Sequence, residues 1–260
     1  MGDRIGNQPT GIGLSLHDIP AAMALLTRLP IPLDHEKAGA RASAAAWAYP
    51  LAGAVVGGIA GTVVWILAAL GLPSGMAAGA GLGALVLLSG GLHEDGLADC
   101  ADGFGGGTTA ERRLEIMKDS RVGAYGVIAL GIALIMRWSG IGEAINANEV
   151  LLLAAVGAVS RMPMTLVMWA MPLARKDGLA ALVGLVPGQT AAIAAAFGLI
   201  LAVLLTGLAG VVLWAVALLA ALPICYFSWQ RIEGYTGDVL GCIQQVAEIA
   251  ALAAAVAILT

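Results

Sequence analysis

Residues 83–107 read GALVLLSGGLHEDGLADCADGFGGG, an apolar run that passes directly into a carboxylate cluster set between glycines. The cluster contains Glu94, Asp95, Asp99 and Asp102, and no lysine or arginine occurs anywhere in the stretch. The run before it is apolar enough to lie in lipid. The stretch therefore predicts acidic chemistry at the edge of a membrane helix.

The composition of the whole chain favours a membrane protein. Hydrophobic residues make up 60% of it and charged residues only 12%, against about 25% charged in a soluble domain. Several stretches approach the roughly 20 apolar residues that cross a bilayer. We predict an all-α, polytopic integral membrane helical bundle, organised as one catalytic domain over residues 1–260. The seven predicted spans are Ala44–Leu70, Gly75–Leu92, Val122–Met136, Val150–Met171, Thr190–Leu208, Val211–Tyr226 and Cys242–Leu259.

The segment before the first span is too short to cross. Residues 18–32, DIPAAMALLTRLPIP, have an apolar run only between Pro20 and Pro30. An apolar helix of this length favours the membrane surface or a re-entrant position. We therefore expect a short interfacial or re-entrant helix there.

The distribution of cations predicts the orientation. With a cytoplasmic N-terminus, eleven of the thirteen Lys and Arg residues fall in inside loops, as the positive-inside rule requires. These eleven are Arg4, Arg28, Lys37, Arg41, Arg112, Arg113, Lys118, Arg121, Arg175, Lys176 and Arg231. Arg137 is the one expected outside, and Arg161 lies within the fourth span. The carboxylate cluster then faces the cytoplasm.

The spacing of the aspartates indicates a shared helix face. Asp95, Asp99 and Asp102 fall at i, i+4 and i+7, where three like charges repel one another. A divalent cation resolves the conflict, and hard oxygen ligands at short spacing suit magnesium. Gly96 and Gly103, also seven apart, are expected to leave room for a bulky ligand. The alternative is a solvated acidic turn.

A basic segment follows the acidic one. Residues 108–121 read TTAERRLEIMKDSR, in which Thr108 and Glu111 have the spacing of a capping box at a helix start. Cations beside a magnesium site suggest phosphate chemistry, because they neutralise charge on the phosphate oxygens. An ordinary solvated helix with ion pairs is the alternative. Asp238, in GYTGDVLG, lies on the same predicted side, either at the site or in a polar turn.

These stretches together resemble the cobalamin synthase family, the adenosylcobinamide-GDP ribazoletransferases. GGLHEDGLADCADGFGG followed by ERRLEIMKDSRVGAYG resembles the family's central signature. LLTRLPIP near the N-terminus and GYTGDVLGCIQQVAE near the C-terminus resemble its other marked stretches, in the expected order. The resemblance covers nearly the whole chain.

The resemblance implies a late step of vitamin B12 synthesis. The family joins adenosylcobinamide-GDP to α-ribazole, or to its 5′-phosphate, and releases GMP. It implies Mg²⁺ as cofactor, the two substrates and membrane lipid as partners, no nucleic acid, and the bacterial cytoplasmic membrane as location. A homo-oligomer is left open. The expected metal ligands are Glu94, Asp95, Asp99 and Asp102, of which Asp99 and Asp102 are also expected to be catalytic. The expected substrate-binding residues are Arg28, Lys118, Arg121 and Asp238.

Two other functions are weighed against this one. The CDP-alcohol phosphotransferases also combine membrane helices with spaced aspartates, but their pattern has an Ala-Arg pair after the first Asp-Gly and a wider later spacing. An ion-coupled transporter is the second alternative, because carboxylates and arginines within spans mark ion pathways. Arg161 is its best support, although a structural partner for a buried carboxylate is the expected role of that residue.

Overall fold

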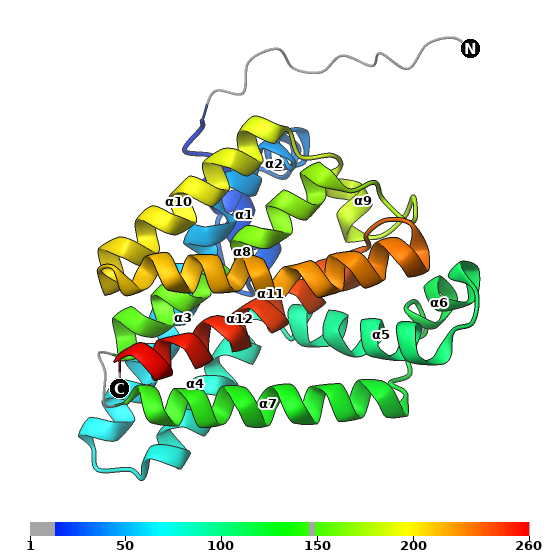
Figure 1. The fold of residues 1–260 in the computed structure, drawn as a ribbon. Coiled ribbons are helices and arrows are strands. Elements are labelled where there is room, and N and C mark those ends of the chain that lie inside the picture. Colours follow the sequence, from blue (N-terminus) through cyan, green and yellow to red (C-terminus); the bar gives the residue numbers. More distant parts are fainter. Residues whose placement is uncertain (1–13, 146–148, 260) are drawn as a thin grey trace, which may run out of the picture.

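The computed structural model describes residues 14–145 and 149–259, and these fold into helices (Figure 1). Within these ranges there is no strand, only an isolated bridge between Leu173 and Tyr235. The all-α prediction is confirmed. The helices are α1 Asp18–Leu26, α2 His35–Ala40, the 3-10 turn η1 Ala44–Ala48, α3 Tyr49–Ala69, α4 Ser74–Ser89, α5 Leu92–Gly106, α6 Ala110–Ile116, α7 Ala124–Ala144, α8 Glu149–Ala170, α9 Leu179–Val183, α10 Gly188–Thr206, α11 Ala209–Ile232 and α12 Gly237–Leu259.

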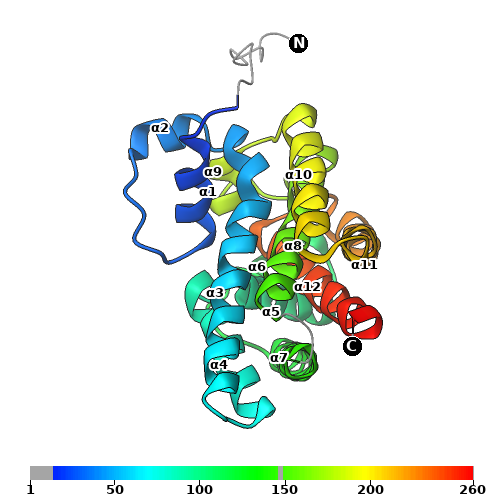
Figure 2. The ribbon, with the colours of Figure 1, turned by 90° about the vertical axis from the view of Figure 1, so that its left-hand side faces the viewer.

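Six of the described segments are long and apolar enough to cross a membrane. They are η1 with α3, then α7, α8, α10, α11 and α12. The pair α4 and α5 passes the same test as one bent unit, which brings the number to as many as seven. Helices α7, α11 and α12 run nearly parallel in Figure 1 and are seen close to end-on in Figure 2. A polytopic helical bundle is thus confirmed.

The bend between α4 and α5 is the main departure from the predicted spans. The sequence predicted one span over Gly75–Leu92, but α4 ends at Ser89 and α5 continues at 87° to it. Gly90 and Gly91 both have positive φ, of 66° and 70°, a conformation that residues with a side chain rarely adopt. The two glycines therefore turn the chain, and the predicted polar loop begins instead as helix α5 inside the bundle.

Glycines allow α3 and α8 to pack with their backbones close together. A Cβ atom added to Gly53 would lie 1.9 Å from the carbonyl oxygen of Gly157, and one added to Gly57 would lie 2.0 Å from that of Leu153. No larger side chain fits at such a contact. The small residues at four-residue spacing in the first span thus form a helix interface.

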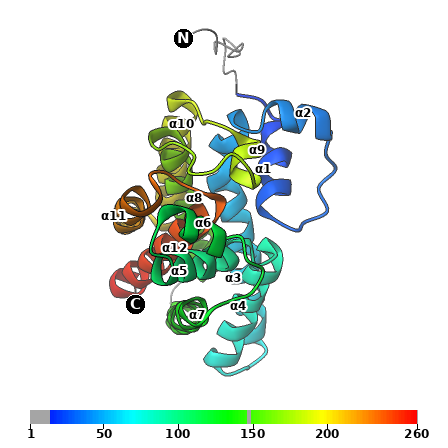
Figure 3. The same ribbon diagram turned by 90° about the vertical axis from the view of Figure 1, so that its right-hand side faces the viewer.

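The N-terminal helices form a flank beside α9, as the two side views show (Figures 2 and 3). Asp18, at the start of the nine-residue helix α1, is buried and accepts hydrogen bonds from the Arg41 guanidinium and from Trp47 Nε1. Burial opposes ionisation of this carboxyl, but these hydrogen bonds outweigh it, and the pKa of Asp18 is lowered. The short helix is confirmed: an ion pair joins it to Arg41, after α2, and the hydrogen bond from Trp47 joins it to η1.

A buried ion network lies where α5, α7, α8 and α12 meet. Arg137 on α7 pairs with Glu94 on α5, at 2.6 Å, and with Glu248 on α12, at 2.8 Å. Arg161 on α8 lies 3.6 Å from Glu248 and donates to the Gly157 carbonyl. The structural role expected for Arg161 is confirmed. The prediction that Arg137 lies in an outside loop is wrong, because its side chain is only 2% exposed inside the bundle.

Candidate active site

The acidic face of α5 is positioned by direct contact with α12. A Cβ atom on Gly96 would lie 2.8 Å from the Asp238 carbonyl oxygen, and Gly241 approaches the Gly96 Cα in turn. This contact brings the α5 carboxylates beside the first turn of α12. It also corrects one expectation: the space beside Gly96 is filled by α12 and that beside Gly103 by Met117, so neither leaves room for a ligand.

We expect Gly96→Ala to destabilise the protein by about 1–3 kcal/mol, because backbone rather than a flexible side chain must move to admit the new methyl group. The change also moves Asp95 and Asp99 relative to Asp238, so activity should fall. Thermal unfolding in detergent measures the stability. Gly83→Ala is the matched control, since nothing lies within 4 Å of its added Cβ. Equal melting temperatures for the two variants would contradict this assignment.

An open cavity of about 520 Å³ lies against this acidic face. Asp95 and Asp99 from α5 line it together with Asp238 from α12. Lys118 and Arg175 line it from the loops that follow α6 and α8. Figure 3 views the end of the bundle where α5, α6 and the beginning of α12 lie together. Asp119 and Asp177, from the same two loops, also line it, so five carboxylates and two cations from four separate segments share one cavity.

The cations are only partly neutralised by the carboxylates around them. Arg175 Nη2 lies 3.1 Å from Asp238 Oδ2 and its Nε lies 3.6 Å from Asp177 Oδ1, but Nε and Nη1 are buried without a hydrogen-bond partner in the described structure. Lys118 pairs with Asp177, and the hydrogen bond from Lys118 lowers the pKa of that carboxyl. Within residues 14–145 and 149–259, neither Asp95 nor Asp99 forms an ion pair. The cavity therefore offers unused donors opposite uncompensated carboxylates.

Asp102, predicted as a metal ligand and catalytic residue, has a different position. Its two carboxylate oxygens accept hydrogen bonds from the backbone N–H groups of Gly123, at 2.7 Å, and Gly126, at 2.9 Å. These groups begin α7, where unpaired N–H groups and the helix dipole favour a negative charge. Asp102 is on the predicted stripe, but α7 covers it, and it is absent from the cavity wall. The structure makes it a cap for α7.

Three further predicted residues lie outside the cavity wall. Glu94 is bound to Arg137 in the ion network. Arg28 packs against Gly90 at the bend between α4 and α5, and its backbone N–H donates to the Leu88 carbonyl. Arg121 is 86% exposed and pairs with Asp119. The structure thus brings together Asp95, Asp99, Lys118 and Asp238 from the predicted set.

The helix that carries the basic segment starts one residue later than predicted. Thr109, not Thr108, caps α6, and its side chain accepts a hydrogen bond from the Arg112 N–H. The helix ends at Ile116, so Lys118 lies in the following turn and reaches across to Asp177. This early end is what lets Lys118 line the cavity.

Sequence reasoning missed three charged residues of this site. Asp119 lies in the turn after α6, whereas Arg175 and Asp177 lie in the loop after α8, in the run ARKDG. Of the latter two, Arg175 was counted only as a loop cation and Asp177 was given no role. An acidic residue directly after a basic pair, on the same predicted side as the carboxylate cluster, was the available signal for Arg175 and Asp177. The long separation from α5 in sequence hid their proximity.

The carboxylates of this cavity can be compared with the ligands that magnesium requires. No three His, Cys, Asp or Glu side chains of the described residues lie close enough to hold a metal as they stand. Magnesium rarely uses such an all-protein cage, however. It keeps several waters and binds through one or two carboxylates together with substrate phosphates. Asp95 and Asp99, without ion pairs in a cavity that also has unused Arg175 donors, fit that mode.

The fold and this cavity define a polytopic helical membrane protein with a mixed acidic and basic site. The family model described as cobalamin-5-phosphate synthase matches residues 18–256. The chain belongs to this family, which confirms the resemblance and the prediction of a transferase, and decides against the two alternatives. No solved structure matches the chain.

Curated relatives agree over almost their full length. The chain is 42% identical to an adenosylcobinamide-GDP ribazoletransferase of Mesorhizobium japonicum, over 91% of this chain and 92% of the relative. It is 42% identical to that of Bradyrhizobium diazoefficiens, over 92% and 93%. A third, from Azorhizobium caulinodans, is 43% identical over 91% and 94%.

Proposed function

We propose that the chain joins adenosylcobinamide-GDP to α-ribazole, or to its 5′-phosphate, in the cavity between α5 and α12. A ribose hydroxyl oxygen forms a bond to the phosphorus attached to cobinamide. The bond from that phosphorus to the oxygen of the GMP unit breaks, GMP leaves, and a carboxylate accepts the hydroxyl proton. The observation that carries the proposal is a single cavity with unpaired Asp95 and Asp99 facing unused donors of Arg175.

Asp95 and Asp99 are the proposed holders of magnesium, with Asp238 alongside them. Bound there, magnesium would neutralise the phosphate oxygens and favour departure of the nucleotide. Asp102 and Glu94 are left out of the proposed ligand set, because Asp102 accepts the α7 amides and Glu94 pairs with Arg137. Of Asp95 and Asp99, the one nearer the acceptor hydroxyl takes up its proton.

Arg175 and Lys118 are proposed to bind the diphosphate. Two nitrogens of the planar Arg175 fork donate no hydrogen bond in the described structure, and one of them, Nη1, also forms no ion pair there, which suits the oxygens of a phosphate. Lys118, in the turn after α6, contributes a second positive charge. It pairs with Asp177, which lies in the same loop as Arg175. Arg28 and Arg121 lie outside the cavity wall, so their proposed contribution is electrostatic attraction of the anionic substrate.

We expect Arg175→Lys to lower kcat/KM for adenosylcobinamide-GDP by about tenfold or more, because lysine keeps the charge but loses the bidentate geometry. Arg121→Lys should stay within about twofold of wild type, since that guanidinium is exposed. Steady-state kinetics with the donor varied measures both. Equal losses of kcat/KM in the two variants would contradict this and would indicate that Arg121 also binds the diphosphate.

The assay that tests the proposed function uses the purified protein in detergent with adenosylcobinamide-GDP, α-ribazole and magnesium. GMP and the cobamide product should form in equal amounts, and chelation of the metal should stop both. Release of GMP without α-ribazole, or no GMP at all, would overturn the proposal. Substituting α-ribazole 5′-phosphate in the same assay shows which acceptor is preferred.

The proposed location is the bacterial cytoplasmic membrane, with the cavity open to the cytoplasm. Arg112, on α6 beside the cavity, and Leu208, in the turn between α10 and α11, should then face opposite sides of the membrane. Each is replaced singly by cysteine after Cys225, the partly exposed native cysteine, is changed to serine. An impermeant thiol reagent on intact cells should label Leu208→Cys alone. Labelling of both would contradict the proposed orientation.

A further inference from the structure

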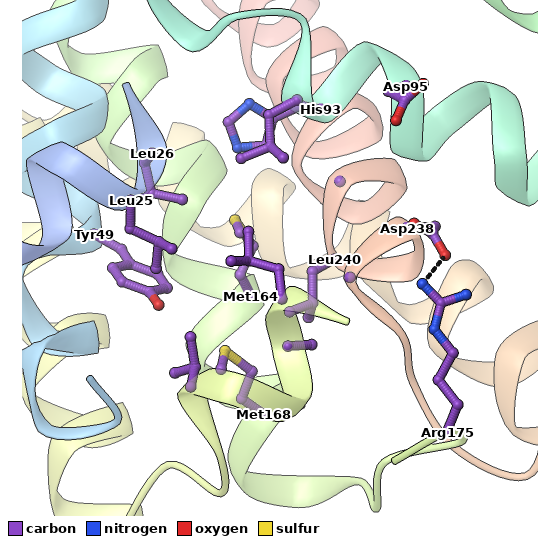
Figure 4. Close-up of a pocket in the computed structure, with 16 residues that line it drawn as sticks. Leu25, Leu26, Tyr49, His93, Asp95, Met164, Met168, Arg175, Asp238 and Leu240 are labelled. Atoms are coloured by element: carbon purple, nitrogen blue, oxygen red, sulfur yellow. Dashed lines mark ion pairs between the residues drawn. The ribbon is translucent and has the colours of Figure 1, made fainter. Parts of the chain in front are cut away.

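A second, smaller cavity of about 110 Å³ opens beside the first. Asp95, Arg175 and Asp238 line both cavities, so these residues form their common wall. The rest of the smaller cavity is largely apolar, and in Figure 4 Leu25, Leu26 and Tyr49 lie on the far side from Asp238 and Arg175. This apolar wall includes Leu25, Leu26, Tyr49, Met164, Met168 and Leu240.

Two side chains of this wall carry polar groups, Tyr49 and His93, and His93 is the one with a buried polar atom that has no partner in the described structure. Its side chain lines the smaller cavity and is only 1% exposed, and its Nε2 has no hydrogen-bond partner among the described residues. A buried polar atom without a partner costs about 1–3 kcal/mol. Such a cost is typical of a site where a ligand supplies the missing partner.

We infer that this cavity binds the benzimidazole base of the ribazole acceptor, with His93 Nε2 hydrogen-bonded to the free ring nitrogen. The inference rests on the proposed function and names the part of that site that takes the acceptor. Benzimidazole is flat and apolar, and its free nitrogen is a single acceptor that matches a single donor. The apolar side of the cavity thus provides a buried donor without a partner where the base needs one.

The other parts of the substrates fit this cavity poorly. Guanine has several donors and acceptors around its edge, and most would be left unpaired against leucine and methionine side chains. The corrin ring is far larger than a cavity of about 110 Å³. A lipid acyl chain would match the apolar wall but would leave His93 Nε2 unpaired. Among these groups, the acceptor base matches both the apolar shape and the unpartnered donor of His93.

The shared wall then decides where the reacting hydroxyl lies. With the base beside His93, the attached ribose extends toward Asp95 and Asp238, at the boundary of the two cavities. The diphosphate of the donor, held by Arg175, reaches the same boundary from the larger cavity. The acceptor hydroxyl and the phosphorus therefore meet beside Asp95, which becomes the carboxylate best placed to accept the proton.

Two variants test the inference by binding rather than by turnover. His93→Phe keeps a ring of similar shape and removes the donor, whereas Val183→Phe reduces the volume of the smaller cavity. Titration with α-ribazole, followed by the fluorescence of its base, should show affinity about tenfold or more weaker in both. The affinity for adenosylcobinamide-GDP should stay within about twofold. Leu185→Phe, on a 63% exposed neighbour, is the control and should bind both substrates as wild type does.

A rescue distinguishes a subsite from a general packing defect. An acceptor whose benzimidazole lacks the methyl groups carried by the base of α-ribazole needs less volume. It should therefore lose less affinity in Val183→Phe than α-ribazole does. Unchanged α-ribazole affinity in both pocket variants, or equal losses for donor and acceptor, would overturn the inference. If wild type releases GMP normally in that case, only the subsite fails. If wild type releases no GMP with either acceptor, the proposed function itself fails.

Discussion

We expect Asp99→Asn to lower kcat by about a thousandfold or more while the protein remains folded. Asparagine has the same shape but lacks the negative charge needed to hold magnesium beside the diphosphate. Because Asp99 lies beside other carboxylates and forms no ion pair within the described structure, removing its charge also relieves repulsion. Its melting temperature should therefore equal or exceed that of wild type. Initial rates of GMP release and thermal unfolding, measured on one preparation, give both values.

Two further variants make this result specific. Glu115→Gln removes an exposed carboxylate that pairs with Arg112 on α6, and its kcat should stay within about twofold of wild type. Asp102→Asn should mainly lose stability, by about 1–3 kcal/mol, because an amide oxygen replaces only one of the two acceptors for the α7 amides. If the Asp102→Asn variant kept its stability but lost activity, Asp102 would belong to the metal site after all.

The dependence on magnesium concentration separates a ligand from a residue that only aligns the substrate. In Asp95→Asn and Asp99→Asn, the magnesium concentration at half-maximal rate should rise about tenfold or more, since each variant removes one hard oxygen ligand. An unchanged magnesium dependence, together with a large fall in kcat, would make that carboxylate the proton acceptor alone.

Local pattern was enough to predict the class of fold and the acidic helix face. The apolar stretches marked the membrane segments, because burial in lipid requires long apolar runs. The spacing of Asp95 and Asp99 placed them on one helix face, and both line the cavity. Gly53 and Gly57, four residues apart in the sequence, lie on the side of α3 that packs on α8.

Contacts between distant segments were beyond local pattern. The spacing that placed Asp102 on the same helix face carried no information about α7. Asp102 lies about 10 Å along α5 from Asp95, and there the first turn of α7 covers it. Arg137 was assigned to an outside loop because the predicted third span ended at Met136. Its two glutamate partners come from α5 and α12, which lie far from it in sequence.

The largest loss of stability should follow from Arg137→Met. Methionine retains much of the side-chain volume but leaves Glu94 and Glu248 buried, with Arg161 as the cation nearest to Glu248, at 3.6 Å. Removing one partner from a buried ion pair costs about 3–5 kcal/mol, because the remaining charge has lost its solvation and its partner. Equilibrium unfolding in detergent measures this loss. Arg112→Met removes a cation from an exposed pair and should cost about 1 kcal/mol or less.

A second substitution shows whether the loss of stability comes from buried charge left without a partner (stranded charge) or from packing. Glu94→Gln in the Arg137→Met background removes one uncompensated carboxylate and should recover part of the stability. If packing alone were responsible, the second change would give no recovery.

The double variant also separates stability from catalysis, because Glu94 precedes Asp95 on α5 and the ion network joins that helix to α7 and α12. A double variant that is stable but slow would show that the ion network positions the acidic face of α5. A double variant less stable than Arg137→Met would contradict the stranded-charge explanation.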